Sequence, residues 1–182
     1  MYPTILVRHR PQLLHDWFLF SMVAIAIFLD RVTKGLIQTN FELGQSLPEE
    51  GLIRLTYITN SGGAFGMFPN QTYLLTLASF GGIGVLWLFY RTLPRLGRMV
   101  RLSLGLQLGG AIGNLIDRLW AGEVVDFIDI GIWPIFNLAD SFIVVGIFLL
   151  LGIFLLEERR DAKLMTSNGS ISCRRPPAEV GC

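Results

Sequence analysis

The sequence predicts an all-α membrane protein with four transmembrane helices, both termini in the cytoplasm, and a small extracytoplasmic β element in the first outward loop. Three observations lead to this fold class. Hydrophobic residues make up 52% of the 182 residues and charged residues only 16%, which is unusual for a soluble domain. Four apolar runs approach the roughly 20 residues needed to cross a hydrocarbon core. Basic residues gather in the connections on one side of these runs.

The four apolar runs define the predicted helices. The first run follows Arg8, His9 and Arg10, as in a secretory signal. The chain then continues into three more runs, so we expect a retained anchor rather than a cleaved leader. The predicted spans are Trp17 to Leu29 with a weak extension to Ile37, Tyr73 to Tyr90, Val100 to Ile116, and Ile135 to Leu156.

The fifteen Lys and Arg residues set the predicted orientation. Most lie in the N-terminal segment, between the second and third spans, or in the tail, and the positive-inside rule places these parts in the cytoplasm. The connections 38–72 and 117–134 therefore face outward. We expect a cytoplasmic segment over residues 1–16, a four-helix transmembrane catalytic domain over 17–160, and a disordered cytoplasmic tail over 161–182.

The first outward connection contains a strand pattern. Leu52 to Ile58 is rich in β-branched and aromatic residues and is followed by the turn-prone run Asn60 to Gly63. This pattern predicts the small β element. The second outward connection is shorter, and its Trp120 and Trp133 suit the interfacial aromatic belt. We expect it to be a loop held against the membrane.

Two sets of residues at the ends of spans allow a structural or a functional interpretation. Asp30 and Lys34 are spaced as an i, i+4 ion pair, which either reaches out to water or supports a site. The third span also contains a seam of small residues that allows close helix packing, made of Gly105, Gly109 and Gly113. The side chains of Asn114, Asp117 and Arg118 share one helical face, where they either join helices in a polar network or contact a substrate.

The fourth span begins with another polar pair, Asn137 and Asp140. Asn137 suits a helix N-cap, and an acidic residue in the first turn suits the helix dipole. A short loop, however, can bring Asp126 to the same place as Asp140. Two neighbouring carboxylates share a proton, so that one acts as an acid and the other as a base. Such a pair can activate water for hydrolysis of a peptide bond at the membrane surface.

Metal, disulfide and nucleic-acid chemistry have little support in the sequence. The two histidines, His9 and His15, lie outside any cluster with metal-ligand spacing. The two cysteines, Cys173 and Cys182, fall in the predicted cytoplasmic tail, where thiols stay reduced. A formal net charge of +1 gives no basic field for nucleic acid. We therefore expect neither a metal site nor a cofactor.

Five motifs in order resemble those of the prolipoprotein signal peptidases, also called signal peptidase II, which are aspartic proteases of bacterial inner membranes. The motifs span residues 30 to 140, whereas residues 1–16 and the tail carry no motif of the family. They are DRVTK from Asp30, NSGGAF from Asn60, GGAIGNLIDR from Gly109, VVDF from Val124, and FNLAD from Phe136.

The resemblance implies a role for each candidate site residue. Asp126 and Asp140 would be the catalytic pair. Asn60, Gly62, Asn114, Arg118 and Asn137 would line the pocket and position the substrate, Asp30 and Lys34 would support it, and Asp117 would be structural.

The resemblance also implies a substrate and a location. The substrate would be a diacylglyceryl-modified prolipoprotein, cut on the N-terminal side of its lipidated cysteine. The enzyme would be a multi-pass protein of the bacterial inner membrane, in contact with lipids, with its active site at the extracytoplasmic face. The β element would hold the substrate from outside. We expect the protein to act as a monomer.

Three alternatives belong to other classes. A Ser/Lys hydrolase would use Ser61 or Ser141 with Lys34, although Asp30 would keep that lysine charged. An ion-coupled transporter would use the carboxylates within the membrane, although they gather at one face. A non-catalytic assembly subunit would use the glycine seam for helix pairing and would tolerate the change of either acid to its amide.

Overall fold

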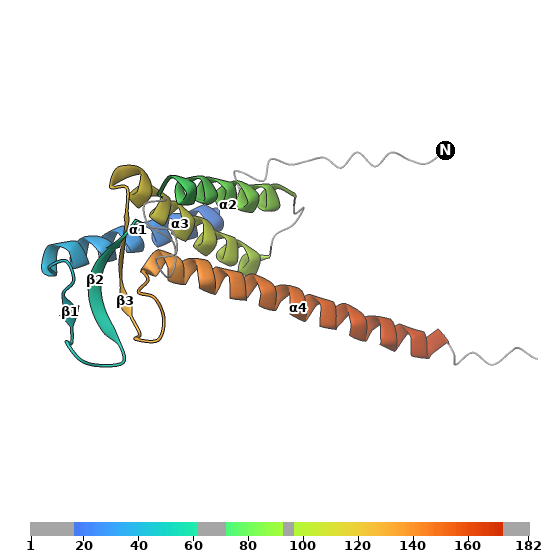
Figure 1. The fold of residues 1–182 in the computed structure, drawn as a ribbon. Coiled ribbons are helices and arrows are strands. Elements are labelled where there is room, and N and C mark those ends of the chain that lie inside the picture. The colour runs from blue at the N-terminus through green and yellow to red at the C-terminus, as the bar shows by residue number, and fades with distance from the viewer. Residues whose placement is uncertain (1–16, 62–71, 93–96, 173–182) are drawn as a thin grey trace, which may run out of the picture.

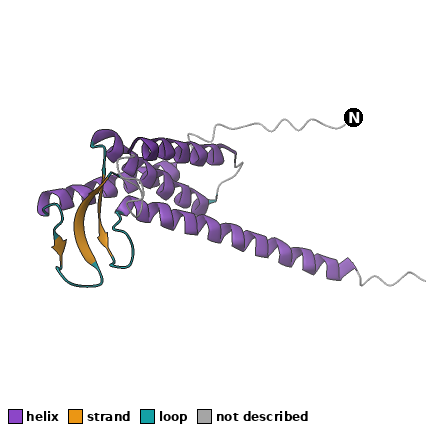
Figure 2. Cartoon of the chain, viewed as in Figure 1, coloured by secondary structure: helices purple, strands orange, loops and turns teal. Residues whose placement is uncertain are grey.

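The computed structural model describes residues 17–61, 72–92 and 97–172. In this part of the chain, four helices lie side by side and a three-stranded sheet covers one end of the group (Figures 1 and 2). The helices are α1 (Trp17–Asn40), α2 (Thr72–Thr92), α3 (Arg98–Trp120) and α4 (Leu138–Ser172), and the strands are β1 (Ser46–Leu47), β2 (Arg54–Asn60) and β3 (Val124–Asp129).

Helix α3 is the central helix and packs against the other three. Its glycines permit this crowding. A Cβ atom at Gly109 would lie 2.5 Å from the Ala26 side chain on α1, and one at Gly113 would lie 2.7 Å from the Asp30 carboxylate on the same helix. Gly105 also faces α1. The predicted seam of Gly105, Gly109 and Gly113 therefore lies along α1, where only a hydrogen atom fits.

The neighbouring Gly110 faces α4 instead. A Cβ atom there would overlap the carbonyl oxygen of Ala139 and lie 3.0 Å from the Ile143 side chain. We expect Gly110→Ala to lower the free energy of unfolding by about 1–3 kcal/mol, because α4 would have to move away from α3. Thermal unfolding in detergent measures this. A Cβ atom at Gly81 on α2 meets nothing within 4 Å, so Gly81→Ala is the matched control, and equal melting temperatures for the two variants would contradict the packing.

The sheet joins the two connections that the sequence predicts to face outward. Strand β2 is the central strand, antiparallel to β1 and to β3. Asn60 on β2 pairs with Val124 on β3, and Ile58 pairs with Asp126. The predicted strand is thus confirmed with a shift of two residues, whereas the segment 117–134, which was expected to be a loop, also contains a strand. That segment supplies β3, whose buried Val125 and Phe127 pack with Ile37 of α1.

The helices confirm part of the predicted membrane topology. Among the described residues, α2, α3 and the Leu138–Arg160 part of α4 are long and apolar enough to cross a membrane. Helix α1 is long enough to cross a membrane, but its second half carries Asp30, Arg31 and Lys34. It is not among the three helices that are also apolar enough. The protein is therefore mainly helical, as predicted, while the fourth span and the orientation of the termini stay predictions.

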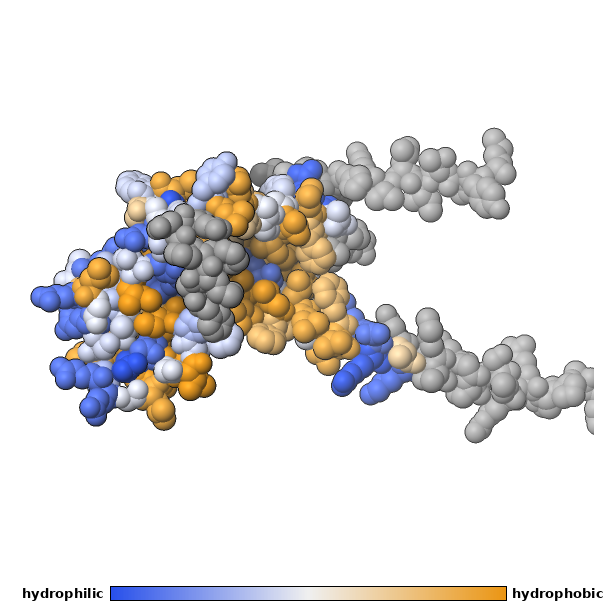
Figure 3. Space-filling model, in the orientation of Figure 1, coloured by the Kyte–Doolittle hydropathy of each residue, from blue (hydrophilic) through white to orange (hydrophobic). Residues whose placement is uncertain are grey.

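The fourth helix differs from the expectation at both ends. It begins at Leu138 rather than Ile135, because the chain before it forms a bridge between Ile128 and Phe136. It continues to Ser172, so residues 161–172 are helical where a disordered tail was expected. Figure 3 shows hydrophobic residues along the middle of α4 and hydrophilic ones farther out. Residues 1–16 and the two cysteines lie outside the described residues.

Candidate active site

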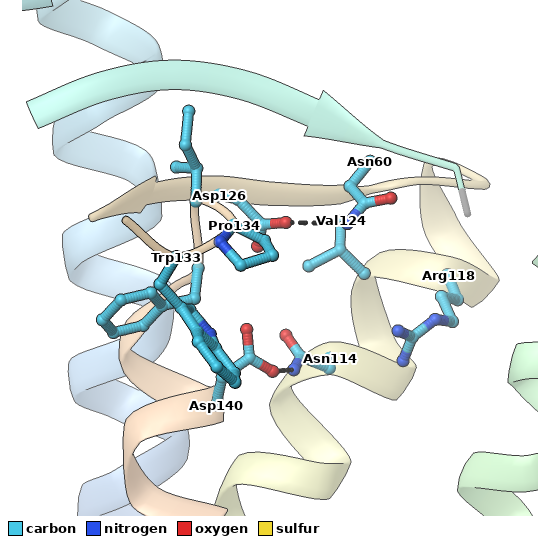
Figure 4. A pocket seen from close by; sticks show the side chains of 10 residues that line it. Asn60, Asn114, Arg118, Val124, Asp126, Trp133, Pro134 and Asp140 are labelled. Atoms are coloured by element: carbon cyan, nitrogen blue, oxygen red, sulfur yellow. Dashed lines mark hydrogen bonds between the residues drawn. The ribbon is translucent and has the colours of Figure 1, made fainter. Parts of the chain in front are cut away.

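A polar cavity of about 210 Å³ lies where the sheet meets the ends of α3 and α4. Its side chains come from elements far apart in the sequence (Figure 4). Asp126 enters from β3 and Asp140 from the first turn of α4. Asn60 from β2 and Asn114 from α3 lie beside these two acids, and Trp133 from the connection before α4 forms part of the wall.

The two carboxylates share one neighbour, Asn137. Its side-chain Nδ2 donates to Asp126 Oδ1 at 2.6 Å, and its backbone N–H donates to Asp140 Oδ2 at 3.2 Å. Asn137 is completely buried and Asp126 is 3% exposed, while Asp140 is partly exposed to the cavity. The structure thus brings Asp126 and Asp140 to one place, where the side-chain amide of Asn137 binds one acid and its backbone N–H binds the other.

Asn137 is also the N-cap of α4. Its side-chain oxygen accepts a hydrogen bond from the Asp140 backbone N–H at 3.0 Å, while the Asp140 carboxylate accepts the Asn137 N–H. This exchange is a capping box with aspartate in place of glutamate. The N-cap interpretation of this pair is therefore confirmed, and the contacts that begin the helix also set the position of the Asp140 carboxylate.

Hydrogen-bond donors fix which way the side chain of Asn114 points. Lys34 Nζ, which can only donate, lies 2.8 Å from Asn114 Oδ1, and Asn137 Nδ2 lies 3.1 Å from the same oxygen. The Asn114 amide nitrogen must then face Asp140, and it donates to Asp140 Oδ1 at 2.7 Å. Lys34 therefore acts on Asp140 through Asn114 without touching it.

A buried charge network surrounds Lys34. Its ammonium group contacts Asp30 at 2.9 Å and Asp117 at 2.7 Å, and Arg31 forms ion pairs with the same two acids. Asp30 is fully buried and Lys34 is 2% exposed, so the pair does not reach out to water. Two buried acids balanced by two bases join α1 to α3 directly behind Asn114.

The remaining candidates lie around the cavity. Asn60 Nδ2 donates to Asp126 Oδ2 at 3.0 Å, so both oxygens of Asp126 accept an amide N–H. The guanidinium of Arg118 lines the cavity and donates to Ser79 on α2 at 3.2 Å. Gly62 lies outside the described residues.

A second buried acid on β3, Asp129, was not among the predicted site residues. Asp129 accepts hydrogen bonds from Arg54 at 2.6 Å, Thr56 at 3.2 Å and the Gly131 backbone N–H at 2.9 Å. The Gly131 N–H, helped by Arg54 and Thr56, lowers the pKa of Asp129. Side chains alternate along a strand, so Asp126 and Asp129 lie on opposite faces. The β-branched run Val124 to Asp129 was the signal that could have revealed this strand.

The pKa of Asp126 is shifted in the opposite direction. Burial raises it to about 6, because a charged carboxylate loses its hydration in the protein. The neighbouring charge of Asp140 adds to the increase, whereas the hydrogen bonds from Asn60 and Asn137 and the charge of Lys34 oppose it. An acid with this pKa can hold or accept a proton near neutral pH.

The arrangement suits acid–base chemistry by two carboxylates. Within the described residues, no three His, Cys, Asp or Glu side chains group as metal ligands. The two acids, each held by amide donors, border a cavity large enough for a few water molecules or a peptide bond.

Comparison with known proteins identifies the family. Residues 22–156 match the family model described as signal peptidase (SPase) II. The lipoprotein signal peptidase of Desulfitobacterium hafniense is 45% identical over 144 residues, covering 78% of this chain and 95% of that protein. The lipoprotein signal peptidase of Moorella thermoacetica is 45% identical over 135 residues, with 74% and 89% covered.

Solved structures agree with these relatives. One described as a bacterial membrane enzyme superposes with a TM-score of 0.70 at 29% identity, over 90% of this chain and 94% of that one. The fold, the five motifs and the matched length lead to the same conclusion. The chain belongs to the signal peptidase II family, the bacterial membrane peptidases that remove signal peptides from prolipoproteins.

Proposed function

We propose that the protein is an aspartic endopeptidase of the bacterial inner membrane, which cuts diacylglyceryl-modified prolipoproteins on the N-terminal side of the lipidated cysteine. One observation carries the proposal. Asp126 and Asp140 border one cavity and are both bonded to Asn137, which supports an acid and a base that act on one water molecule in that cavity.

The proposed reaction needs one proton on the pair. The ionised carboxylate takes a proton from water as the water oxygen attacks the scissile carbonyl carbon, and the protonated carboxyl donates to the carbonyl oxygen. The tetrahedral intermediate then collapses. As the C–N bond breaks, the acid that took a proton from water gives it to the leaving amine, and a hydroxyl group of the intermediate returns its proton to the other acid, which restores one protonated and one ionised acid.

The surrounding residues position the acids and the substrate. The amides of Asn60, Asn114 and Asn137 hold the carboxylates in place, since each donates to at least one of their oxygens. Arg118 lies at the border of the cavity, where its guanidinium can bind a carbonyl of the substrate backbone. Lys34 supports the site through Asn114.

The position of the acids suits a lipid-anchored substrate. Asp140 lies in the first turn of an apolar helix and Asp126 lies on the adjoining strand, so the pair is at the end of the helical group rather than at its middle. In the proposed orientation this end faces outward. A diacylglyceryl group would hold the scissile bond at this depth. The same position disfavours the transporter alternative, which needs carboxylates along a path through the membrane.

The pKa of Asp126 predicts how activity depends on pH. Because the raised pKa of about 6 keeps Asp126 protonated below that pH, we expect kcat/KM to fall by about tenfold per unit as the pH rises beyond it. A pH profile of signal-peptide release measures this. Asp129→Asn changes an acid on the same strand but outside the cavity, so its activity should fall with the same midpoint pH as that of the wild type. A flat profile from about pH 5 to about pH 8 would contradict the shared proton.

The test of the proposed function uses purified protein in detergent with a chelator present. A diacylglyceryl-modified prolipoprotein and the same prolipoprotein without lipid are supplied in parallel, and release of the signal peptide is followed by gel shift. We expect cleavage of the lipidated substrate only. Equal cleavage of both, or cleavage abolished by the chelator, would contradict the proposal.

A further inference from the structure

Two grooves lead away from Asp140, and the mechanism above uses neither. The first, here called the α4 groove, has a volume of about 410 Å³ and runs from Asp140 past Trp133 and Phe136 to Val144 and Val145. The second, here called the α2–α3 groove, has a volume of about 530 Å³ and runs from Asp140 and Arg118 to Gly82 and Gln107. Both reach the cavity that holds the acid pair.

The grooves lie on opposite sides of Asp140. Successive residues of a helix are rotated by about 100°, so Val144 is about 40° from Asp140 in one direction and Ile143 about 60° in the other. Val144 borders the α4 groove and Ile143 borders the α2–α3 groove. A molecule whose scissile bond lies at Asp140 can therefore extend into both grooves at once.

The chemistry of the two grooves differs. Beyond Asp140 and Ser141, the side chains of the α4 groove are apolar, and Val144 and Val145 on its floor are each 49% exposed on the outer surface of α4. Such a surface has few hydrogen-bond partners for a peptide backbone. It suits a hydrocarbon chain, which has no hydrogen bond to satisfy.

The α2–α3 groove carries polar groups along α3. Gln107, Asn114 and Arg118 are spaced by seven and four residues and share one face of the helix. Gln107 is mostly buried, and its Nε2 donates to Ser103 at 3.0 Å. Amide and guanidinium groups at successive depths provide partners for a polypeptide where it leaves its own helix to be cut.

We propose that the two grooves sort the two apolar parts of the substrate: the acyl chains of the diacylglyceryl group occupy the α4 groove, and the signal peptide occupies the α2–α3 groove. The assignment rests on the proposed function, in which the scissile bond separates these two parts. Val144 and Val145 are then specificity-determining residues for the lipid.

The α4 groove provides space for the acyl chains but adds little to the binding affinity of the substrate. Lipid tails are as apolar as the groove, so an acyl chain gains little by moving from the bilayer into it. A blocked groove instead displaces the attached cysteine from Asp140. A displacement of about 1 Å at the reacting atoms can lower the reaction rate about a hundredfold.

The first test narrows the α4 groove with Val144→Trp. The control is Ile147→Trp on the same helix, because Ile147 is equally exposed (49%) and does not border the groove. Each variant is given prolipoproteins with hexadecanoyl or butanoyl chains. Relative to the control, we expect Val144→Trp to lower kcat/KM at least about tenfold for the long chains and to leave the short-chain substrate nearly unchanged. Val145→Phe serves as a second variant if Val144→Trp does not fold.

The second test narrows the α2–α3 groove. A Cβ atom at Gly82 or at Gly84 meets nothing within 4 Å, and only Gly82 borders the groove, so Gly82→Leu is compared with Gly84→Leu. We expect Gly82→Leu to slow cleavage of the full prolipoprotein at least about tenfold, but not cleavage of a lipopeptide that lacks the apolar part of the signal peptide.

The outcomes distinguish an error in the groove assignment from an error in the proposed function. If the wild type cleaves but Val144→Trp and Ile147→Trp respond alike to chain length, the lipid assignment is wrong. If the rate of Val144→Trp depends on the presence of the signal peptide, and that of Gly82→Leu on the length of the acyl chains, the two grooves hold the opposite parts of the substrate. That result also overturns the proposal. A wild type that cleaves neither substrate would overturn the proposed function itself.

Discussion

Asp126→Asn and Asp140→Asn each abolish cleavage, with an expected loss of at least about a thousandfold in rate. Asparagine has nearly the same shape as aspartate, but it can neither take a proton from water nor give one to the leaving amine. The side-chain oxygen that remains in each variant can still accept the hydrogen bond from Asn60 at residue 126 or from Asn114 at residue 140, whereas the NH₂ group takes the place of the oxygen that accepts from Asn137. Initial rates of signal-peptide release measure the loss.

Asp129→Asn is the matched control for this prediction. Asp129 is a buried acid on the same strand, but its partners are Arg54, Thr56 and Gly131 rather than the cavity. We expect all three variants to stay folded, because each keeps the shape of the side chain, and we expect only Asp129→Asn to cleave. More than about a tenth of the wild-type rate in either site variant would contradict the catalytic role of that acid.

Lys34→Met is expected to cost about 3–5 kcal/mol of stability, because it leaves buried carboxylates without their main partner. Asp30 and Asp117 would face each other with only Arg31 between them, and the Asn114 amide would lose one of the two donors that set its direction. Unfolding by denaturant in detergent measures the cost.

Two further variants identify the cause of this loss. Arg91→Met removes an exposed base at the end of α2 and should change stability by less than about 0.5 kcal/mol. Adding Asp30→Asn to Lys34→Met should recover part of the stability, since one unpaired charge is removed. If Lys34→Met is as stable as Arg91→Met, the network does not hold α1 against α3.

Local patterns in the sequence predicted the helices well. Apolar runs of the right length gave the approximate positions of α2, α3 and α4, and residues spaced three and four apart gave the shared face of Asn114 and Arg118. The extent of α1 was harder to predict, because Asp30 and Lys34 interrupt its apolar pattern. Their burial depends on Asp117, which lies more than eighty residues away in the chain, and no local pattern carries that information.

The sheet and the details of the site depended on pairing between distant segments. Strand β3 is short, and its aspartates break the apolar pattern, so its pairing with β2 is visible only in the folded chain. The resemblance indicated that Asp126 and Asp140 belong together. It did not indicate that Asn137 joins them while capping α4, or that Lys34 fixes the direction of the Asn114 amide.

The measurement that tests the central claim most directly is a single turnover of lipidated prolipoprotein in heavy-oxygen water, with both products weighed by mass spectrometry. Wild type and Asp126→Asn are compared with a chelator present. The account predicts that the wild type releases a signal peptide with one heavy oxygen in its new carboxylate and a mature fragment that begins at the lipidated cysteine, while Asp126→Asn releases nothing. A cut elsewhere, or the same labelled product from Asp126→Asn, would contradict it.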